Sequence, residues 1–201
     1  MTQSTANKIL SRIYGKGRGW CFTPSHFLDL SSRKTAIETL RRLTNRGTIR
    51  RLAQGLYDYP QKHQKLGLLS PNPENIAQAL AGRDSTRILP SGAYAANILG
   101  LSEQVPAKII FLTDGPARKI KIGNQEIILK KTTSRNMALA DKISGLIIQS
   151  LRHIGQKQIT DEHIASLTKT LTAKDKKRLK LDAKYAPAWL YPIIKKITDD
   201  K

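Results

Sequence analysis

Residues able to do covalent or metal chemistry are scarce in this sequence. It has one cysteine, so it cannot form an intramolecular disulfide, and its four histidines do not cluster with that cysteine as zinc ligands would. Two of the histidines fall on separate predicted helices and lack the carboxylate spacing of a metal or acid–base site. We therefore expect no catalytic residue, no metal and no cofactor, and we interpret the cysteine as a small buried hydrophobe. These residues are Cys21, His26, His63, His153 and His163.

Side chains that recognise nucleic acid are concentrated in residues 31–52, which hold seven basic residues and one acidic residue. Three of them suit the edges of particular bases. Arg42 can bind guanine through two hydrogen bonds, Asn45 can pair with adenine, and Glu38 can accept a hydrogen bond from cytosine. We expect Arg42 in particular to set the sequence preference.

Other residues of the same segment suit phosphate. A predicted helix begins just after Ser31 and Ser32, and the free backbone N–H groups of a helix N-terminus attract anions. Arg50, Arg51 and Gln54 follow that helix, where they would contact the DNA backbone or the minor groove and bind all sequences about equally. The complete expected DNA-binding set is Ser31, Ser32, Arg33, Lys34, Thr35, Glu38, Arg42, Asn45, Arg46, Arg50, Arg51 and Gln54.

The elements that must position these side chains read as a winged helix-turn-helix in residues 1–62. A first helix ends at the glycine-rich stretch 15–19, and a short apolar strand follows at 20–22. A second helix begins at Pro24, which suits the first helical position because proline lacks an N–H group. Phe27 and Leu28 would then face the core.

The third helix would enter the major groove, as the second helix of a helix-turn-helix does. It ends at Gly47, and a hairpin follows with strands at 48–52 and 56–60 around the three-residue loop 53–55. The apolar residues of this third helix recur at helical spacing, which predicts one buried face. They are Ala36, Ile37, Leu40 and Leu43.

The rest of the chain reads as a C-terminal α+β domain at 71–201 with a helical end, so the fold class is α+β. A polar stretch at 61–73 ends in turn-forming residues and predicts a linker. Short helices at 73–80 and 90–99 precede a buried strand at 107–112 and a hairpin around Gly123. The predicted helices that follow are 137–151, 160–171 and 174–185, with a terminal helix near Pro192.

The charge of the chain points to a polyanionic partner. Its 35 Lys and Arg residues against 15 Asp and Glu give a formal net charge of +20 and an isoelectric point near 10.3. Residues 1–62 hold 12 basic and 3 acidic residues, and residues 135–201 hold 14 and 7. The sequence lacks a signal-peptide pattern and any run of about 18 apolar residues. We therefore expect a cytoplasmic protein associated with the nucleoid, with no membrane partner.

Three segments resemble AbiEi-type antitoxins, the antitoxins of abortive-infection systems. Residues 43–57, LTNRGTIRRLAQGLY, are similar to the wing of that family's N-terminal winged-helix domain. Residues 89–101, LPSGAYAANILGL, and 108–115, KIIFLTDG, are similar to a helix, turn and strand of its C-terminal region. The resemblance covers residues 1 to about 135, and the lysine-rich C-terminal helices match it less clearly.

This resemblance implies an autorepressor that binds inverted repeats of double-stranded DNA in its own promoter. It also implies an antitoxin that opposes a nucleotidyltransferase-like toxin without forming a stable complex, as in type IV systems. Two alternatives remain open at this point: a nuclease-like enzyme that uses the winged helix to deliver substrate, and an RNA-binding protein. The lack of a metal-site cluster and the low aromatic content, 5%, weigh against them.

Overall fold

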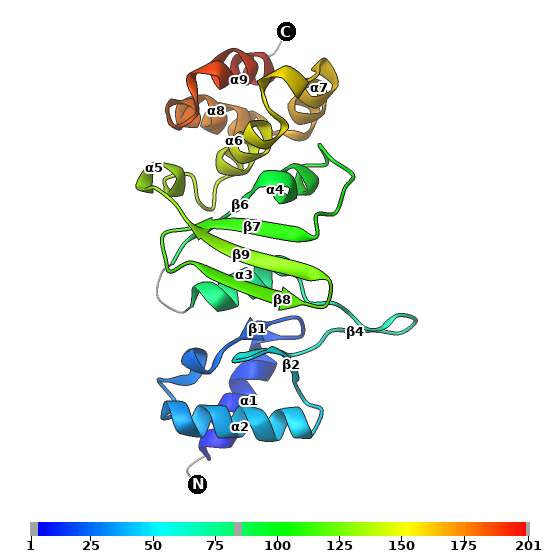
Figure 1. Ribbon diagram of the computed structural model, residues 1–201, viewed down its shortest axis with the longest axis vertical. Coiled ribbons are helices and arrows are strands. Elements are labelled where there is room, and N and C mark those ends of the chain that lie inside the picture. Colours follow the sequence, from blue (N-terminus) through cyan, green and yellow to red (C-terminus); the bar gives the residue numbers. More distant parts are fainter. Residues whose placement is uncertain (1–3, 83–85, 200–201) are drawn as a thin grey trace. The chain divides into compact units, whose positions relative to one another are not determined.

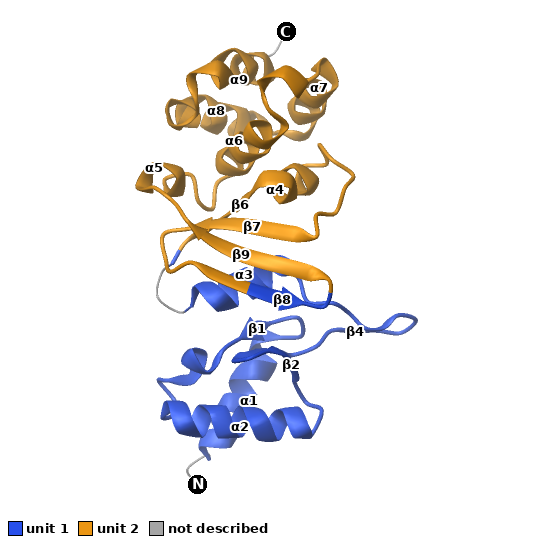
Figure 2. Cartoon of the chain, viewed as in Figure 1, with its two compact units in different colours: residues 1–86, 120–123 blue, residues 87–119, 124–201 orange. Residues whose placement is uncertain are grey.

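A computed structural model describes residues 4–82 and 86–199. The chain forms two compact units, residues 1–86 with 120–123 and residues 87–119 with 124–201 (Figure 2). Both units combine helices with strands, and the chain ends in helices (Figure 1). The predicted α+β class with a helical C-terminal end is therefore confirmed.

Unit 1 begins with helix, short strand, helical turn, helix and hairpin, in the order that the sequence predicted. The three strands form an antiparallel sheet in the order β1-β3-β2. The elements are α1 (Thr5–Lys16), β1 (Cys21–Phe22), a 3-10 helix (Pro24–Phe27), α2 (Arg33–Asn45), β2 (Arg50–Ala53) and β3 (Leu56–Asp58).

The second of the three expected helices is only this four-residue 3-10 turn. Thr23 caps it and Pro24 occupies its first position, as predicted, but the chain turns away again directly after Phe27. Too few residues separate cap and turn to complete an α-helix. Phe27 is buried as expected, whereas the prediction that Leu28 faces the core is wrong, because Leu28 is 48% exposed.

The core of unit 1 gathers around aromatic rings. Phe22 and Phe27 meet edge to face with ring centroids 5.6 Å apart, and Trp20 covers Phe22 at 4.6 Å. Helix α2 contributes Ala36, Leu40 and Leu43 to this cluster, and Thr39 is buried beside them. The prediction that Ile37 belongs to the buried face is wrong, since 42% of that residue is exposed. The buried stripe is rotated toward Thr39.

The hairpin is tighter than predicted. Ala53 pairs with Leu56, so the loop is the two-residue turn Gln54-Gly55, and the register shifts between Arg51 and Ala53 as in a β-bulge. Gly55 has a φ of 71°, a backbone conformation that a side chain would disfavour.

The linker that the sequence predicted at 61–73 carries structure of its own. It contains the short hairpin of β4 (Lys62–His63) and β5 (Gly67–Leu68), and α3 (Pro73–Ala81) follows within unit 1. The Asn75 side-chain amide donates to the Gly19 carbonyl oxygen at 2.8 Å, and five residues of α3 are buried. Because α3 packs on β1 in this way, unit 1 continues past the expected boundary at 62.

A four-stranded sheet has the order β6-β7-β9-β8; unit 2 contains it except for residues 120–122 of β8, which belong to unit 1. Strands β7 and β9 run parallel, and β6 pairs antiparallel with β7. The sequence did not predict β6, because Pro90 suggested a helix start; the edge position of β6 tolerates the missing N–H group. The elements are β6 (Ile88–Ser91), α4 (Gly92–Ile98), β7 (Lys108–Thr113), β8 (Arg118–Ile122) and β9 (Gln125–Lys131).

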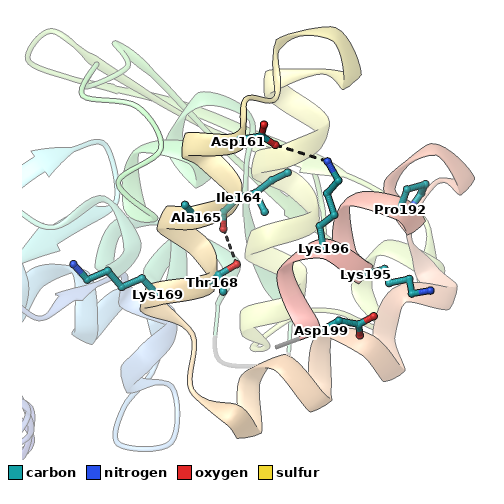
Figure 3. Close-up of a pocket in the computed structure, with 9 residues that line it drawn as sticks. All are labelled: Asp161, Ile164, Ala165, Thr168, Lys169, Pro192, Lys195, Lys196 and Asp199. Atoms are coloured by element: carbon teal, nitrogen blue, oxygen red, sulfur yellow. Dashed lines mark hydrogen bonds and ion pairs between the residues drawn. The ribbon is translucent and has the colours of Figure 1, made fainter. Parts of the chain in front are cut away.

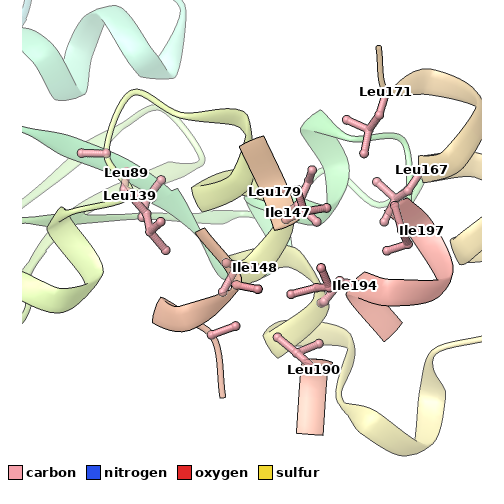
Figure 4. Close-up of a cluster of buried hydrophobic side chains, with 14 of the residues drawn as sticks. Leu89, Leu139, Ile147, Ile148, Leu167, Leu171, Leu179, Leu190, Ile194 and Ile197 are labelled. Atoms are coloured by element: carbon pink, nitrogen blue, oxygen red, sulfur yellow. The ribbon is translucent and has the colours of Figure 1, made fainter. Parts of the chain in front are cut away.

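The C-terminal helices enclose the core of unit 2 (Figure 4). The single helix predicted at 137–151 is two helices, since the chain turns at Asp141, whose φ is 58°. Pro192 occupies the first turn of the last helix, where it needs no hydrogen-bond partner. The helices are α5 (Ser134–Met137), α6 (Ile143–Ile154), α7 (Asp161–Thr170), α8 (Ala173–Asp182) and α9 (Tyr191–Thr198).

No helix within the described residues is long and apolar enough to cross a bilayer.

Candidate nucleic-acid interface

Helix α2 presents a polar face opposite its buried stripe. Ser32 caps the helix: its hydroxyl accepts from the Thr35 backbone N–H at 3.2 Å and lies 2.9 Å from the Thr35 hydroxyl. At 100° per residue, the centre of the exposed face opposite Ala36 and Leu40 falls on four residues. They are Lys34, Glu38, Arg41 and Asn45.

Glu38 sits at the middle of this face and holds two arginines. Arg41 donates to both of its carboxylate oxygens, at 3.0 and 2.9 Å, and Arg42 donates to one of them at 3.1 Å. The hydrogen bonds from Arg41, and then those from Arg42, lower the pKa of the Glu38 carboxyl to about 2. In this structure the Glu38 and Arg42 side chains are paired with each other, and their expected roles as base readers stay predictions.

Three basic residues of the same helix are uncommitted. In the part of the chain that the structure describes, Arg33, Lys34 and Arg46 are exposed and form no hydrogen bond or ion pair through their side chains. Arg33 and Lys34 lie in the first turn, directly after the Ser32 cap, and Arg46 follows the last turn. A phosphate at either end of α2 would meet a free cation.

The other residues in or next to α2 that were expected to contact DNA differ in exposure. Thr35 and Asn45 are exposed, as base or phosphate contact requires. The Ser31 hydroxyl oxygen is buried and has no hydrogen-bond partner among the described residues. The expected contact of Ser31 with phosphate stays a prediction, and it requires this hydroxyl to become accessible.

Arg50 has a structural role that the sequence did not reveal. Its guanidinium donates to both oxygens of Asp58, at 3.1 and 2.6 Å, and to the Leu69 carbonyl oxygen at 2.9 Å. Asp58 is only 1% exposed, so this ion pair is needed to balance a buried charge. The side chain holds β2, β3 and the segment after β5 together, and its expected contact with DNA stays a prediction.

At the β2–β3 hairpin, Arg51 and Gln54 are exposed, as expected for residues that contact DNA. Gln54 lies at the turn, and Arg51 is exposed on β2 with a single long contact, 3.4 Å, from its Nε to the Ala53 carbonyl oxygen. Both side chains can reach a ligand without breaking a strong interaction.

Two residues of this surface were not predicted from the sequence. Arg41 was placed on the flank of the face and lies near its centre, and Ile37 was assigned to the core and is exposed. Both errors have one source, because the apolar pattern alone allowed the buried stripe to include residue 37. In the structure the polar residue Thr39 is buried and the apolar residue Ile37 is exposed.

The described residues were also compared with the requirements of a metal site, and the lone cysteine with those of a reactive thiol. Among residues 4–82 and 86–199, no three His, Cys, Asp or Glu side chains gather where they could hold a metal ion. Burial, followed by the nearby Asp58 carboxylate, raises the pKa of the Cys21 thiol to about 12. Cys21 is 1% exposed and, as predicted, packs as a small hydrophobe.

Comparison with known proteins identifies the family of this chain, and that family has no described activity. A model of the DUF6088 family, described as a family of unknown function, matches residues 8–179. The chain belongs to the DUF6088 family. No curated protein matches this DUF6088 chain.

One solved structure similar to the DUF6088 chain is the RV2827C protein from Mycobacterium tuberculosis. The two chains share 14% sequence identity. Their structural alignment covers 99% of the DUF6088 chain and 78% of the RV2827C chain, with a TM-score of 0.47. Likeness at this level carries no conclusion about function.

Proposed function

We propose that unit 1 is a winged-helix domain that binds double-stranded DNA through the exposed face of α2 and the turn of the β2–β3 hairpin. One observation carries the proposal: α2 buries one face in the core, its opposite face is polar and carries the uncommitted Lys34, and the uncommitted Arg33 and Arg46 lie at its two ends. A helix that is held firmly by its apolar stripe and is cationic outside has the properties of a recognition helix.

The side chains of the surface divide into positioning and reading roles. Arg33 and Lys34 sit beside the free N–H groups of the first turn and suit phosphate, as Arg51 does on the hairpin. Asn45 suits a base edge, and Glu38 keeps Arg41 and Arg42 oriented in the groove. Ile37 supplies an apolar contact of the kind that reads the methyl group of thymine.

Binding to the promoter of its own gene tests the proposal. We expect fluorescence anisotropy to show tighter binding to a promoter duplex than to a scrambled duplex. Replacing Arg46 and Asn45 together (Arg46→Gln, Asn45→Ala) should reduce this preference, whereas Lys174→Gln with Lys177→Gln, two exposed lysines of α8, should not. Equal affinity of the unaltered protein for both duplexes would refute sequence-specific binding.

The proposed contact between Ile37 and a thymine methyl group can be tested by removing that methyl group. Replacing thymines of the bound site one at a time by deoxyuridine removes only a methyl group. At the contacted thymine we expect about a fourfold loss of affinity, since burying one methyl group contributes ~0.8 kcal/mol. The Ile37→Ala variant should be insensitive to the same replacement. A loss that persists in Ile37→Ala assigns the methyl contact to another residue.

We further propose that the chain is a non-enzymatic autorepressor and antitoxin. The resemblance of segments 43–57, 89–101 and 108–115 to AbiEi-type antitoxins supports this, with inverted promoter repeats as the operator and a nucleotidyltransferase-like toxin as the functional partner. Co-expression with the product of a neighbouring nucleotidyltransferase-like gene should restore growth, and a promoter fusion should be repressed. Repression without rescue would support a repressor that is not an antitoxin.

A further inference from the structure

The C-terminal helices carry an open groove that the DNA-binding proposal does not use. It lies between α7 and α9 and has a volume of about 1030 Å³ (Figure 3). Each helix contributes one face, with residues spaced three or four apart. The lining residues are Asp161, Ile164, Ala165, Thr168 and Lys169 from α7, and Pro192, Lys195, Lys196 and Asp199 from α9 and its end.

The floor of the groove is apolar. Ile164 packs against the core of unit 2, and Ala165 and Pro192 add small apolar surfaces. The Thr168 hydroxyl donates to the Ile164 carbonyl oxygen at 2.8 Å, so it does not need a ligand. Among the described residues, no polar side-chain atom of the lining is buried without a hydrogen-bond partner. Such a floor suits apolar side chains better than a polar small molecule.

The charge that remains unpaired on the rim is positive. Lys196 pairs with Asp161 at 3.7 Å across the two helices, and Asp199 pairs with Lys180 of α8 at 3.1 Å. Both lining carboxylates are therefore engaged. Lys169 and Lys195, on opposite walls, form no ion pair within the described part of the chain (Figure 3).

We propose that this groove binds an amphipathic helix of a partner protein that carries carboxylates on its polar flanks. The apolar face of the incoming helix would lie on Ile164, Ala165 and Pro192, and its carboxylates would meet Lys169 and Lys195. This is the helix-in-groove mode of recognition, in which residues spaced three and four apart anchor the helix. A nucleic acid fits less well, because the floor offers apolar surface where phosphates would need polar partners.

The inference does not rest on the DNA-binding proposal. The groove lies wholly in unit 2, and its α9 wall lies beyond residues 8–179, the part that the family model matches. The α7 wall lies inside that match, so the partner would be recognised by one wall within the match and one wall beyond it.

Two synthetic peptides of about 18 residues, five helical turns, test the proposal on the full chain. They share one Leu/Ala face and carry either Glu or Lys on both flanks. We expect the Glu peptide, and not the Lys peptide, to shift backbone amide NMR signals of α7 and α9. Lys169→Glu with Lys195→Glu should weaken the Glu peptide about tenfold by reversing both rim charges, a loss of ~1.4 kcal/mol. Ala165→Trp should block the floor.

A matched control carries the same charge change elsewhere. Lys174→Glu with Lys177→Glu on α8 should leave the affinity for the Glu peptide within about twofold of the original. An unchanged amide spectrum outside the groove establishes that each variant is folded. If the charge reversal perturbs the fold, Ala165→Trp still tests whether the peptide binds in the groove. Equal binding of the two peptides, or binding that survives both groove variants, would overturn the proposal. So would a DNA duplex that shifts the same amides and loses that effect in Lys169→Glu with Lys195→Glu.

Discussion

Asp58 is a carboxylate buried in the sheet of unit 1, and Arg50 is the group that balances its charge. The two form a bidentate pair, and the same guanidinium binds the Leu69 carbonyl oxygen. Without Arg50, the Asp58 charge would be buried and unpaired, which costs far more than an exposed pair contributes. The side chain is therefore a structural element of the hairpin.

Replacing Arg50 should accordingly affect stability before it affects DNA binding. We expect Arg50→Met to lower the free energy of unfolding by about 3 kcal/mol, because breaking a buried pair typically costs 3–5 kcal/mol and Arg50 retains some exposure. Urea denaturation measures the loss. Arg50→Met combined with Asp58→Leu should recover much of it, since no charge then remains buried. Unchanged stability with weakened DNA binding would return Arg50 to the DNA-contacting set.

Glu38 sets the behaviour of the two arginines beside it. We expect Glu38→Gln to raise affinity for a random duplex, because Arg41 and Arg42 become free to meet phosphate and one negative charge is lost. Glu162→Gln, the same change on exposed α7, serves as the control in anisotropy titrations. If Glu38→Gln behaves like the control, the two arginines do not approach the DNA.

The pH dependence of this cluster follows from the lowered pKa of Glu38. A lowered carboxyl pKa means that the ion pairs are fully present above the ordinary value of 4.5 and are lost as the pH falls toward about 2. Between pH 5 and 8 the carboxylate stays ionised. Any change in DNA affinity over that range should therefore persist in Glu38→Gln.

At the scale of elements, local signals predicted the features that depend on neighbours in the sequence. The Thr23–Pro24 start, the Gly55 turn and the Ser32 cap act through bonds to near neighbours, so the sequence alone indicates them. The elements that it missed depend on partners distant in sequence. β6 exists because it pairs with β7, and α6, which begins after the turn at Asp141, packs against β6 and α4.

The turn at Asp141 gives a prediction about Gly145. A Cβ atom built on Gly145 would clash with the backbone carbonyl of Leu139, just before the turn. We expect Gly145→Ala to destabilise the chain by about 2–3 kcal/mol, since backbone cannot move aside as a flexible side chain can. Gly15→Ala is the control: it lies in α1 with open space around it and should stabilise by roughly 0.5 kcal/mol. Similar melting temperatures for the two variants would contradict the packing of α6.

At the scale of the whole molecule, the net charge of +20 is spread over both units. Polyanions respond to all of it, but only residues in contact with phosphate release counterions on binding. The uncommitted cations of α2 and the exposed lysines of α8 therefore make different predictions for the dependence of DNA affinity on salt.

We expect Arg33→Gln with Lys34→Gln to reduce the slope of log affinity against log salt concentration by about 1.8, or ~0.9 for each phosphate that is no longer neutralised. Lys174→Gln with Lys177→Gln removes the same charge from α8 and should leave the slope unchanged. Anisotropy titrations across a salt series measure both. Equal reductions would indicate a second DNA-contacting surface in unit 2.

The sequence by itself determined the α+β class, the order of elements in residues 1–62 and the basic character of α2, because these follow from local periodicity, capping and charge. Tertiary structure alone decided which polar residues of that surface are uncommitted. Arg50 and Arg51 are neighbours of identical type, yet one balances a buried carboxylate and the other is exposed. The difference comes from Asp58, eight residues from Arg50 in the chain, which strand pairing brings directly opposite it.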